Sequence, residues 1–276
     1  MRHKAGALTL AALLSLSACT SPSPSPSPSP SPTRSPSPSP ETSKHLPGPR
    51  VGRTVVFTGD YETGDFTQWT RCQNRKFSDP CADYDGDFYG ARIVDSGDAR
   101  QGDYAARFEV RNGDKPDFGG GERSEVSAYG DAKVHEGDER WYQFSLKFDE
   151  DFPDVKGNFF IVMQWHAGDD SSPPMSLTVN HDRELVLSSN SEIDKNRVIG
   201  KIRRGEWVDY VLHVRFSRSQ DRGYAEVWQD GQLVLRRHRR ANMTTDSNYL
   251  KMGIYRANTE RSTAIIWQDG LRVTAP

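Results

Sequence analysis

The sequence predicts an all-β fold for residues 51–276, an antiparallel β-sandwich or jelly roll. Short runs of alternating, β-branched and aromatic residues recur along this segment, and Gly, Asp, Asn and Pro separate them. No long stretch shows the 3.6-residue recurrence of apolar side chains that marks an amphipathic helix. About thirteen such runs in one segment are typical of a large sandwich or jelly roll, whose curved sheet offers a groove for an extended polymer.

The predicted strands follow one another closely along the chain. In order they are Thr54–Thr58, Phe88–Asp95, Tyr104–Val110, Glu122–Tyr129, Arg140–Phe148, Asn158–His166, Met175–Asn180, Glu184–Ser189, Trp207–Phe216, Tyr224–Gln229, Gln232–Arg237, Tyr249–Arg256 and Thr263–Thr274.

The Trp207–Phe216 run shows the alternation most clearly. Val208, Tyr210 and Leu212 alternate with polar residues such as Asp209 and His213. This pattern predicts an antiparallel strand with one buried face and one face in water.

The first residues have the features of a secretory signal. A basic start, Met1–Lys4, precedes an apolar run that is too short to span a bilayer. The run ends in Leu16-Ser17-Ala18-Cys19, which resembles the bacterial lipobox. We predict a lipoprotein signal peptide over residues 1–18 and a lipidated Cys19 that anchors the exported chain at the cell surface, in the cytoplasmic membrane. An ordinary signal cleaved near Ala18, with a secreted product, is the alternative.

Residues 19–50 are predicted to be a disordered linker, because their Ser-Pro repeat has no apolar side chains to bury. The net charge of −2 becomes −4 once residues 1–18 are removed, since Arg2 and Lys4 are the charged residues there. Such a chain is no polybasic nucleic-acid binder. Cys72 and Cys81 stand nine residues apart and predict a disulfide in an oxidising compartment.

Three predicted strands carry polar residues of interest. In the first, Glu122–Val126, Arg123 and Glu125 lie on one face of the strand. A carboxylate two residues from an Arg can hold the guanidinium rigidly while it still presents donors to an anion. A structural surface ion pair is the alternative reading.

The second strand, Asn158–His166, is apolar until its end. Gln164 and His166 share one face there, and polar groups at such a place need partners. A histidine with a purely structural role at the rim of the core is the alternative.

The third strand, Tyr249–Arg256, places Leu250, Met252 and Ile254 toward the core. Lys251 and Tyr255 then stand on the opposite face, with Gly253 between them leaving room for a ligand. An ordinary solvated sheet face is the alternative.

Together these strands supply two cations, an amide, an imidazole and a phenol. This set suits β-elimination at a 4-linked uronic acid, in which the proton at C5 is removed beside a carboxylate. Donors that bind the carboxylate stabilise the enolate-like charge that develops. A His or Tyr must take the proton, and a Tyr or His must protonate the leaving oxygen.

The motifs ERSEV (Glu122–Val126), QWH (Gln164–His166) and YLKMGIYR (Tyr249–Arg256) resemble the strands of jelly-roll polysaccharide lyases. With DYETGDFTQW (Asp60–Trp69), they are most similar to the heparin lyase I-like and glucuronan lyase-like group, and more distantly to alginate lyases. The resemblance implies a concanavalin-like antiparallel sandwich that cleaves a glucuronan-, heparin- or alginate-like polysaccharide.

The resemblance also implies roles for individual residues. His166 and Tyr255 are expected to transfer protons, with Gln164, Arg123 and Lys251 around the carboxylate. Their neighbours Glu125, Trp165, Tyr249 and Arg256 are expected to help bind the substrate. No cofactor is expected to be required, and the chain is expected to be a monomer.

Several members of this fold bind calcium away from the chemistry. Asp60, Glu62 and Asp269, with Asp65 nearby, offer the hard oxygen ligands that calcium prefers, although acidic turns are usually only turns.

Two other functions fit the same fold. A lectin-like module would need no proton-transfer residues. A laminarinase-like glycoside hydrolase needs two carboxylates around the scissile bond. The nearest string, Glu192–Arg197, lacks the second Glu of the Glu-x-Asp-x-x-Glu pattern.

Overall fold

A computed structural model describes residues 51–168, 171–189 and 195–276. The predicted signal peptide, linker and Cys19 lie outside these ranges, as do Glu192 and Asp194. Among the described residues there is no α-helix, only two short 3₁₀ turns, and no helix long and apolar enough to cross a membrane.

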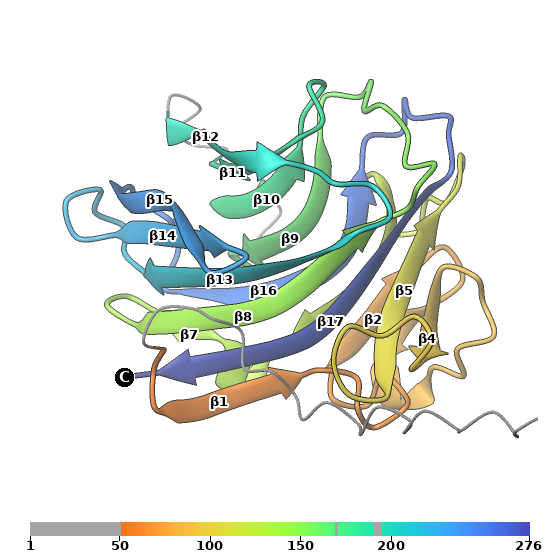
Figure 1. The fold of residues 1–276 in the computed structure, drawn as a ribbon, viewed down its shortest axis with the longest axis horizontal. Helices are drawn as coiled ribbons and strands as arrows, with labels where there is room; N and C mark the ends of the chain where they lie inside the picture. The colour runs from red at the N-terminus through yellow and green to blue at the C-terminus, as the bar shows by residue number, and fades with distance from the viewer. Residues whose placement is uncertain (1–50, 169–170, 190–194) are drawn as a thin grey trace, which may run out of the picture. The chain divides into compact units, whose positions relative to one another are not determined.

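Two antiparallel sheets form the domain (Figure 1). The eight-stranded sheet has the order β15-β14-β13-β8-β17-β5-β4, with β1 beside the far end of β17. Its strands are β1 (Thr54–Gly59), β4 (Ala91–Asp95), β5 (Tyr104–Val110), β8 (Glu139–Phe148), β13 (Trp207–Arg215), β14 (Tyr224–Gln229), β15 (Gln232–Arg239) and β17 (Ala264–Ala275).

The nine-stranded sheet has the order β12-β11-β10-β9-β16-β6-β2-β3, with β7 beside β16. Its strands are β2 (Arg71–Asn74), β3 (Ser78–Pro80), β6 (Glu122–Ala128), β7 (Val134–His135), β9 (Phe160–His166), β10 (Met175–Val179), β11 (Glu184–Ser188), β12 (Arg197–Lys201) and β16 (Ser247–Arg256). All thirteen predicted strands are present, with ends shifted by up to three residues, and the all-β sandwich is confirmed.

The core between the sheets is rich in aromatic residues. Tyr142 of β8 packs edge-on against Trp165 of β9 and against Phe216, and each of the three is almost fully buried. Burial of side chains of this size is worth about 1.5–3 kcal/mol each. Because large apolar side chains alternate with other residues along β8 and β9, their burial determines which face of each sheet packs against the core.

The prediction of a face in water on β13 is wrong. Asp209 is only 8% exposed and accepts hydrogen bonds from Arg100 and Ser145. His213 is equally buried between Glu139 and Glu226. These polar side chains lie on the outer face of the sheet, but partners from neighbouring segments cover them and satisfy their hydrogen bonds.

Candidate active site

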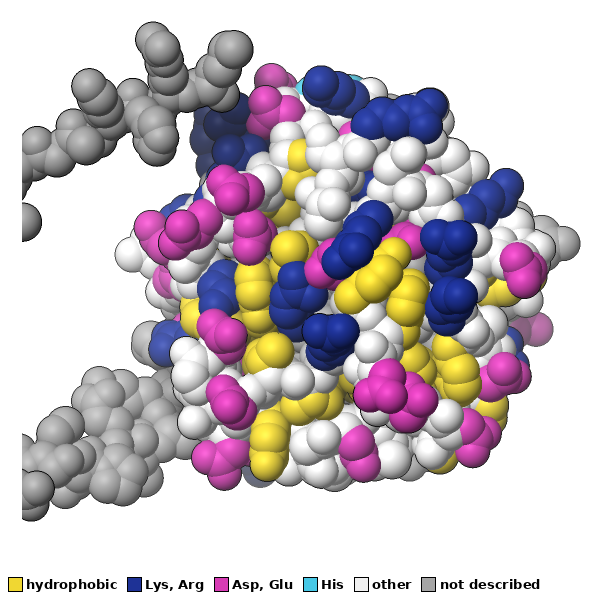
Figure 2. All heavy atoms as spheres, turned by 90° about the vertical axis from the view of Figure 1, so that its right-hand side faces the viewer, with side chains coloured by type: hydrophobic (Ala, Val, Ile, Leu, Met, Phe, Trp, Pro, Cys, Tyr) yellow, Lys and Arg dark blue, Asp and Glu magenta, His cyan; other side chains and the backbone are white. Residues whose placement is uncertain are grey.

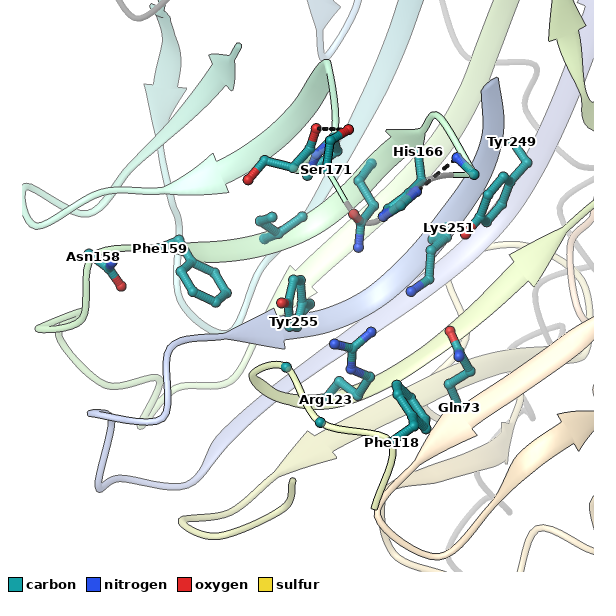
Figure 3. Close-up of a pocket in the computed structure, with 17 residues that line it drawn as sticks. Gln73, Phe118, Arg123, Asn158, Phe159, His166, Ser171, Tyr249, Lys251 and Tyr255 are labelled. Carbon is teal, nitrogen blue, oxygen red and sulfur yellow. Dashed lines mark hydrogen bonds between the residues drawn. The ribbon is translucent and has the colours of Figure 1, made fainter. Parts of the chain in front are cut away.

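A cleft of about 760 Å³ lies on the face of the nine-stranded sheet that points away from the core (Figure 3). It contains six of the predicted side chains: Arg123, Gln164, His166, Tyr249, Lys251 and Tyr255. The three polar motifs thus meet in one place, because β6, β16 and β9 are adjacent strands.

Strand register brings the polar groups side by side. His166 lies opposite Tyr249, and Gln164 lies opposite Lys251, across the β9–β16 pair. On the other side of β16, Tyr255 lies opposite Arg123 of β6. Directly opposite residues of antiparallel strands have Cβ atoms about 5 Å apart, so these side chains form rows across the cleft.

The buried carboxylate of Glu125 joins three of these side chains. Its Oε2 accepts a hydrogen bond from Lys251 Nζ at 2.7 Å, and its Oε1 accepts one from Gln164 Nε2 at 2.5 Å. Arg123 Nη1 lies 3.5 Å from Oε2. Glu125 itself is 3% exposed and does not line the cleft. The prediction that it binds the substrate directly is therefore wrong, and Glu125 instead positions the donors.

This cluster carries a net charge of +1, from two cations and one carboxylate. Burial is the largest influence on Lys251 and lowers the pKa of its ammonium; Arg123 acts in the same direction, while Glu125 opposes both. Charge of this sign in a desolvated cleft favours a bound anion over a neutral group.

Tyr255 stands next to Arg123 in the cleft (Figure 3). Its ring lies over the Arg123 guanidinium, with the Cζ atom 4.1 Å from the ring centroid, and its Oη accepts a hydrogen bond from Gly121 N–H at 3.4 Å. The turn before β6 passes close to the Arg123 side chain and requires glycine at position 120. Gly120 has φ of +78°, and a Cβ there would meet Arg123 Nη2.

His166 is held by its own turn. Gly168 N–H donates to His166 Nδ1 at 3.1 Å (Figure 3). A ring nitrogen that accepts a hydrogen bond carries no proton, so neutral His166 carries its proton on Nε2. In this tautomer the ring is a hydrogen-bond donor through Nε2 and has no free site there to accept a proton.

The phenol of Tyr249 stays protonated. Burial, and then the stacked Tyr129 ring 4.5 Å away, raise the pKa of Tyr249 above its usual value. Tyr249 is therefore a hydrogen-bond donor beside His166, whose ring centroid is 5.4 Å away.

Besides Glu125, two further predicted substrate-binding residues lie away from the cleft. Arg256 is fully buried on the core side of β16, where its Nε donates to Glu122 Oε2 at 2.9 Å and its Nη1 donates to the Ser262 carbonyl. Trp165 is also fully buried, against Tyr142. Both predictions are wrong because these residues alternate with the cleft residues and so point to the opposite face of the sheet.

The role predicted for Gly253 also changes. It has φ of +126°, and a Cβ would meet the Ser124 carbonyl oxygen and Glu125 Cα of the neighbouring strand. The β9–β16 register shifts at the same point. Glycine is needed here for the backbone of an irregular strand, whatever the ligand.

Several residues that line the cleft were not predicted from the sequence. Gln73 comes from the short strand β2, opposite Glu125, and Phe118, Asn158 and Phe159 come from loops (Figure 3). The disulfide between Cys72 and Cys81 is confirmed, with Cα atoms 4.9 Å apart, and it fixes β2 at the edge of the cleft. Cys72 is buried, so alternation from it would have pointed Gln73 outward.

The predicted calcium ligands are engaged with the backbone. Asp269 Oδ2 accepts hydrogen bonds from the amides of Arg100 and Gln101, and Glu62 accepts them from Asp103 and Tyr104. The described residues contain no group of three His, Cys, Asp or Glu side chains that could hold a metal. Calcium binding stays a prediction. A melting temperature that does not change when a chelator is added would contradict this prediction.

A cleft lined by cations and aromatic rings on one sheet of an antiparallel sandwich suits an extended, negatively charged polymer. The family model described as polysaccharide lyase matches residues 61–272. The chain therefore belongs to the polysaccharide lyase family, and it is a lyase.

Solved structures share the fold at low identity. An endo-β-1,4-glucuronan lyase from the fungus Trichoderma reesei is 17% identical, with a TM-score of 0.59 over 81% of this chain and 96% of that one. The alginate lyase AlgAT5 is 18% identical, with a TM-score of 0.51 over 71% and 87%. The cellulose-induced protein Cip1 is 9% identical, with a TM-score of 0.51 over 80% and 97%. A search of curated proteins finds no significant match.

Proposed function

We propose that this lyase cleaves a 4-linked uronate polymer by β-elimination in the cleft of the nine-stranded sheet. The observation that carries the proposal is the cluster around Glu125, which holds Lys251, Gln164 and Arg123 together beside Tyr255. A sugar carboxylate fits such a net positive set of donors. Binding it there withdraws charge from C5 and makes the C5 proton easier to remove.

Tyr255 is assigned both proton transfers. As a phenolate it takes the C5 proton; the C4–O4 bond then breaks, a C4=C5 double bond forms, and the phenol returns the proton to O4. Neutral His166, with its proton on Nε2, cannot take a further proton at that nitrogen and serves as a hydrogen-bond donor.

One residue that serves both transfers requires the C5 proton and O4 to lie on the same side of the sugar. D-Glucuronate and D-mannuronate meet this requirement, whereas L-guluronate and L-iduronate do not. Similarity to the fungal glucuronan lyase agrees with the first of these. The preferred substrate class is therefore a polymer of D-glucuronate or D-mannuronate.

A substrate panel tests the proposal. Glucuronan, hyaluronan, heparin, mannuronate-rich alginate and guluronate-rich alginate are incubated with the protein, and the ultraviolet absorbance of the unsaturated product is followed. Absorbance should rise with a glucuronate or mannuronate polymer. Reducing ends released from a neutral glucan without this absorbance would reject the lyase reaction on uronates in favour of hydrolysis.

The glycoside hydrolase and the lectin-like module receive less support. None of the described residues that line the cleft is Asp or Glu, and hydrolysis of a glycosidic bond needs two carboxylates there. A binding module would not need the Tyr255, His166 and Lys251 constellation.

We further propose that the chain is exported and lipidated on Cys19, with the Ser-Pro linker holding the domain away from the membrane. The support is the order of basic start, apolar run and Cys19 in the sequence. Signal-peptide processing that continues unchanged in globomycin would contradict lipidation.

A further inference from the structure

A row of cationic and aromatic side chains crosses the outer face of the eight-stranded sheet. Cross-strand pairs place Arg92 of β4 beside Arg107 of β5, Arg107 beside Trp267 of β17, Trp267 beside Lys147 of β8, and Lys147 beside Trp207 of β13. We call these five residues the outer row. Adjacent strands are about 4.8 Å apart, so the outer row spans roughly 19 Å.

The cations and rings of the outer row are in contact. Lys147 Nζ lies 4.5 Å from the ring centroid of Trp267 and 5.2 Å from that of Trp207. Arg107 Cζ lies 5.7 Å from the Trp267 centroid. Both indole side chains are partly exposed, and Arg92 is exposed.

The outer row has an excess of positive charge. Arg107 pairs with Glu109 at 2.7 Å, and Lys147 lies 3.5 Å from Asp98. Three cations therefore face two carboxylates. Figure 2 shows the side of the molecule on which Figure 1 places β4 and β5, and Lys and Arg side chains lie beside hydrophobic ones there.

The neighbouring stretch of the same face is closed. Asp269, Ser145 and Asp209 lie one step further along β17, β8 and β13. Arg100 and Gln101 fold over them, with hydrogen bonds to all three. The outer row is thus a partly exposed stretch of the sheet next to a covered one.

We propose that the outer row binds a second segment of an acidic polysaccharide, on the opposite side of the core from the cleft. The exposed parts of the two indoles offer apolar contact to sugar rings, and the interleaved cations pair with carboxylates. Two sites on one molecule raise its avidity for a long polymer without changing the cleft. The class of ligand rests on the proposed function.

Binding is tested with the full chain carrying Tyr255→Phe, so that the polymer is not degraded. Migration is measured in gels containing glucuronan or hyaluronan, with dextran as the neutral comparison and excess glucuronate tetrasaccharide present to fill the cleft. Adding Trp207→Ala and Trp267→Ala should weaken the remaining retardation about tenfold. The matched variant Trp141→Ala removes another partly exposed indole of the same outer face and should leave retardation unchanged.

Retardation that the double variant does not change, or that dextran produces equally, overturns the proposal. Thermal unfolding shows that each variant is folded, and Lys147→Ala offers a second variant that removes a cation and no ring. Failure of the proposed function is a separate result: it appears as no cleavage of any uronate polymer by the unmodified chain, whatever the gels show.

Discussion

Lys251 Nζ lies 2.7 Å from Glu125 Oε2, and both side chains are at most 3% exposed. A buried ion pair of this kind costs desolvation energy that an apolar pair of the same size would not cost. Its presence directly beneath the cleft indicates that it serves to place Lys251 and Gln164 beside the sugar.

Replacing Glu125 separates its contribution to stability from its role in positioning Lys251 and Gln164. Glu125→Gln should lower the free energy of unfolding by about 3–5 kcal/mol, because the Lys251 ammonium is left buried without its counter-charge. The double variant Glu125→Gln with Lys251→Met should recover much of this stability and none of the activity. Denaturant unfolding and the rate of product formation measure the two effects. A single variant with full activity would contradict the positioning role.

The proton-transfer assignment distinguishes Tyr255 from His166. Tyr255→Phe should lower kcat by about a hundredfold or more while the melting temperature stays close to that of the unmodified protein. His166→Gln keeps a side-chain N–H donor and should retain about tenfold more activity than His166→Ala. Equal loss in the two His166 variants would instead favour His166 as a proton-transfer group.

Activity should fall in alkaline solution before an exposed lysine loses its charge. Burial lowers the pKa of Lys251 below the ordinary value of 10.5, so its ammonium deprotonates earlier as pH rises. The pH profile of kcat/KM should show this fall, and Lys251→Arg should move it to higher pH, since Arg keeps its charge. An unmoved alkaline fall would assign it to another group.

The same shift has a consequence for stability. Between the folded and unfolded pKa values of Lys251, the unfolded chain binds more protons than the folded one, so the free energy of unfolding rises with pH in that window. Lys251→Arg should lack this rise, which denaturant unfolding at a series of alkaline pH values would reveal.

Arg256 should matter for folding and not for the reaction. Arg256→Ala leaves the buried Glu122 carboxylate without its partner and should cost about 3–5 kcal/mol of stability. Arg256→Met combined with Glu122→Gln removes both charges and should restore stability with kcat/KM unchanged. A large loss of kcat/KM in this folded double variant would return Arg256 to the substrate site.

The sequence predicted the long strands well because each has enough alternating residues to show its period. Strands β2, β3, β7 and β12 were missed: β2 and β3 are polar and short, and β7 has two residues. Because β2 was not predicted, Gln73 was not predicted as a cleft residue either. Arg256 and Trp165 were predicted in the cleft because they belong to the same motifs as cleft residues. A motif shows which residues are adjacent in sequence, but alternation along the strand decides which face of the sheet each side chain points to.

The outer face of β13 shows a second limit. Polar residues there, such as His213 and Asp209, read as solvent-facing because the chain segments that cover them are distant in sequence. Contacts of this kind depend on the complete topology, which local patterns do not contain.

The alternation along β16 has an evolutionary consequence. Leu250, Met252 and Ile254 belong to the core, while Lys251 and Tyr255 belong to the cleft, so selection can act on either group with little effect on the other. Descendants of such a strand can exchange cleft side chains, and with them the sugar that is accepted, without opening a cavity in the core. Divergence toward new polymers can therefore proceed through substitutions at the cleft positions of β16, with Gly253 retained for the backbone.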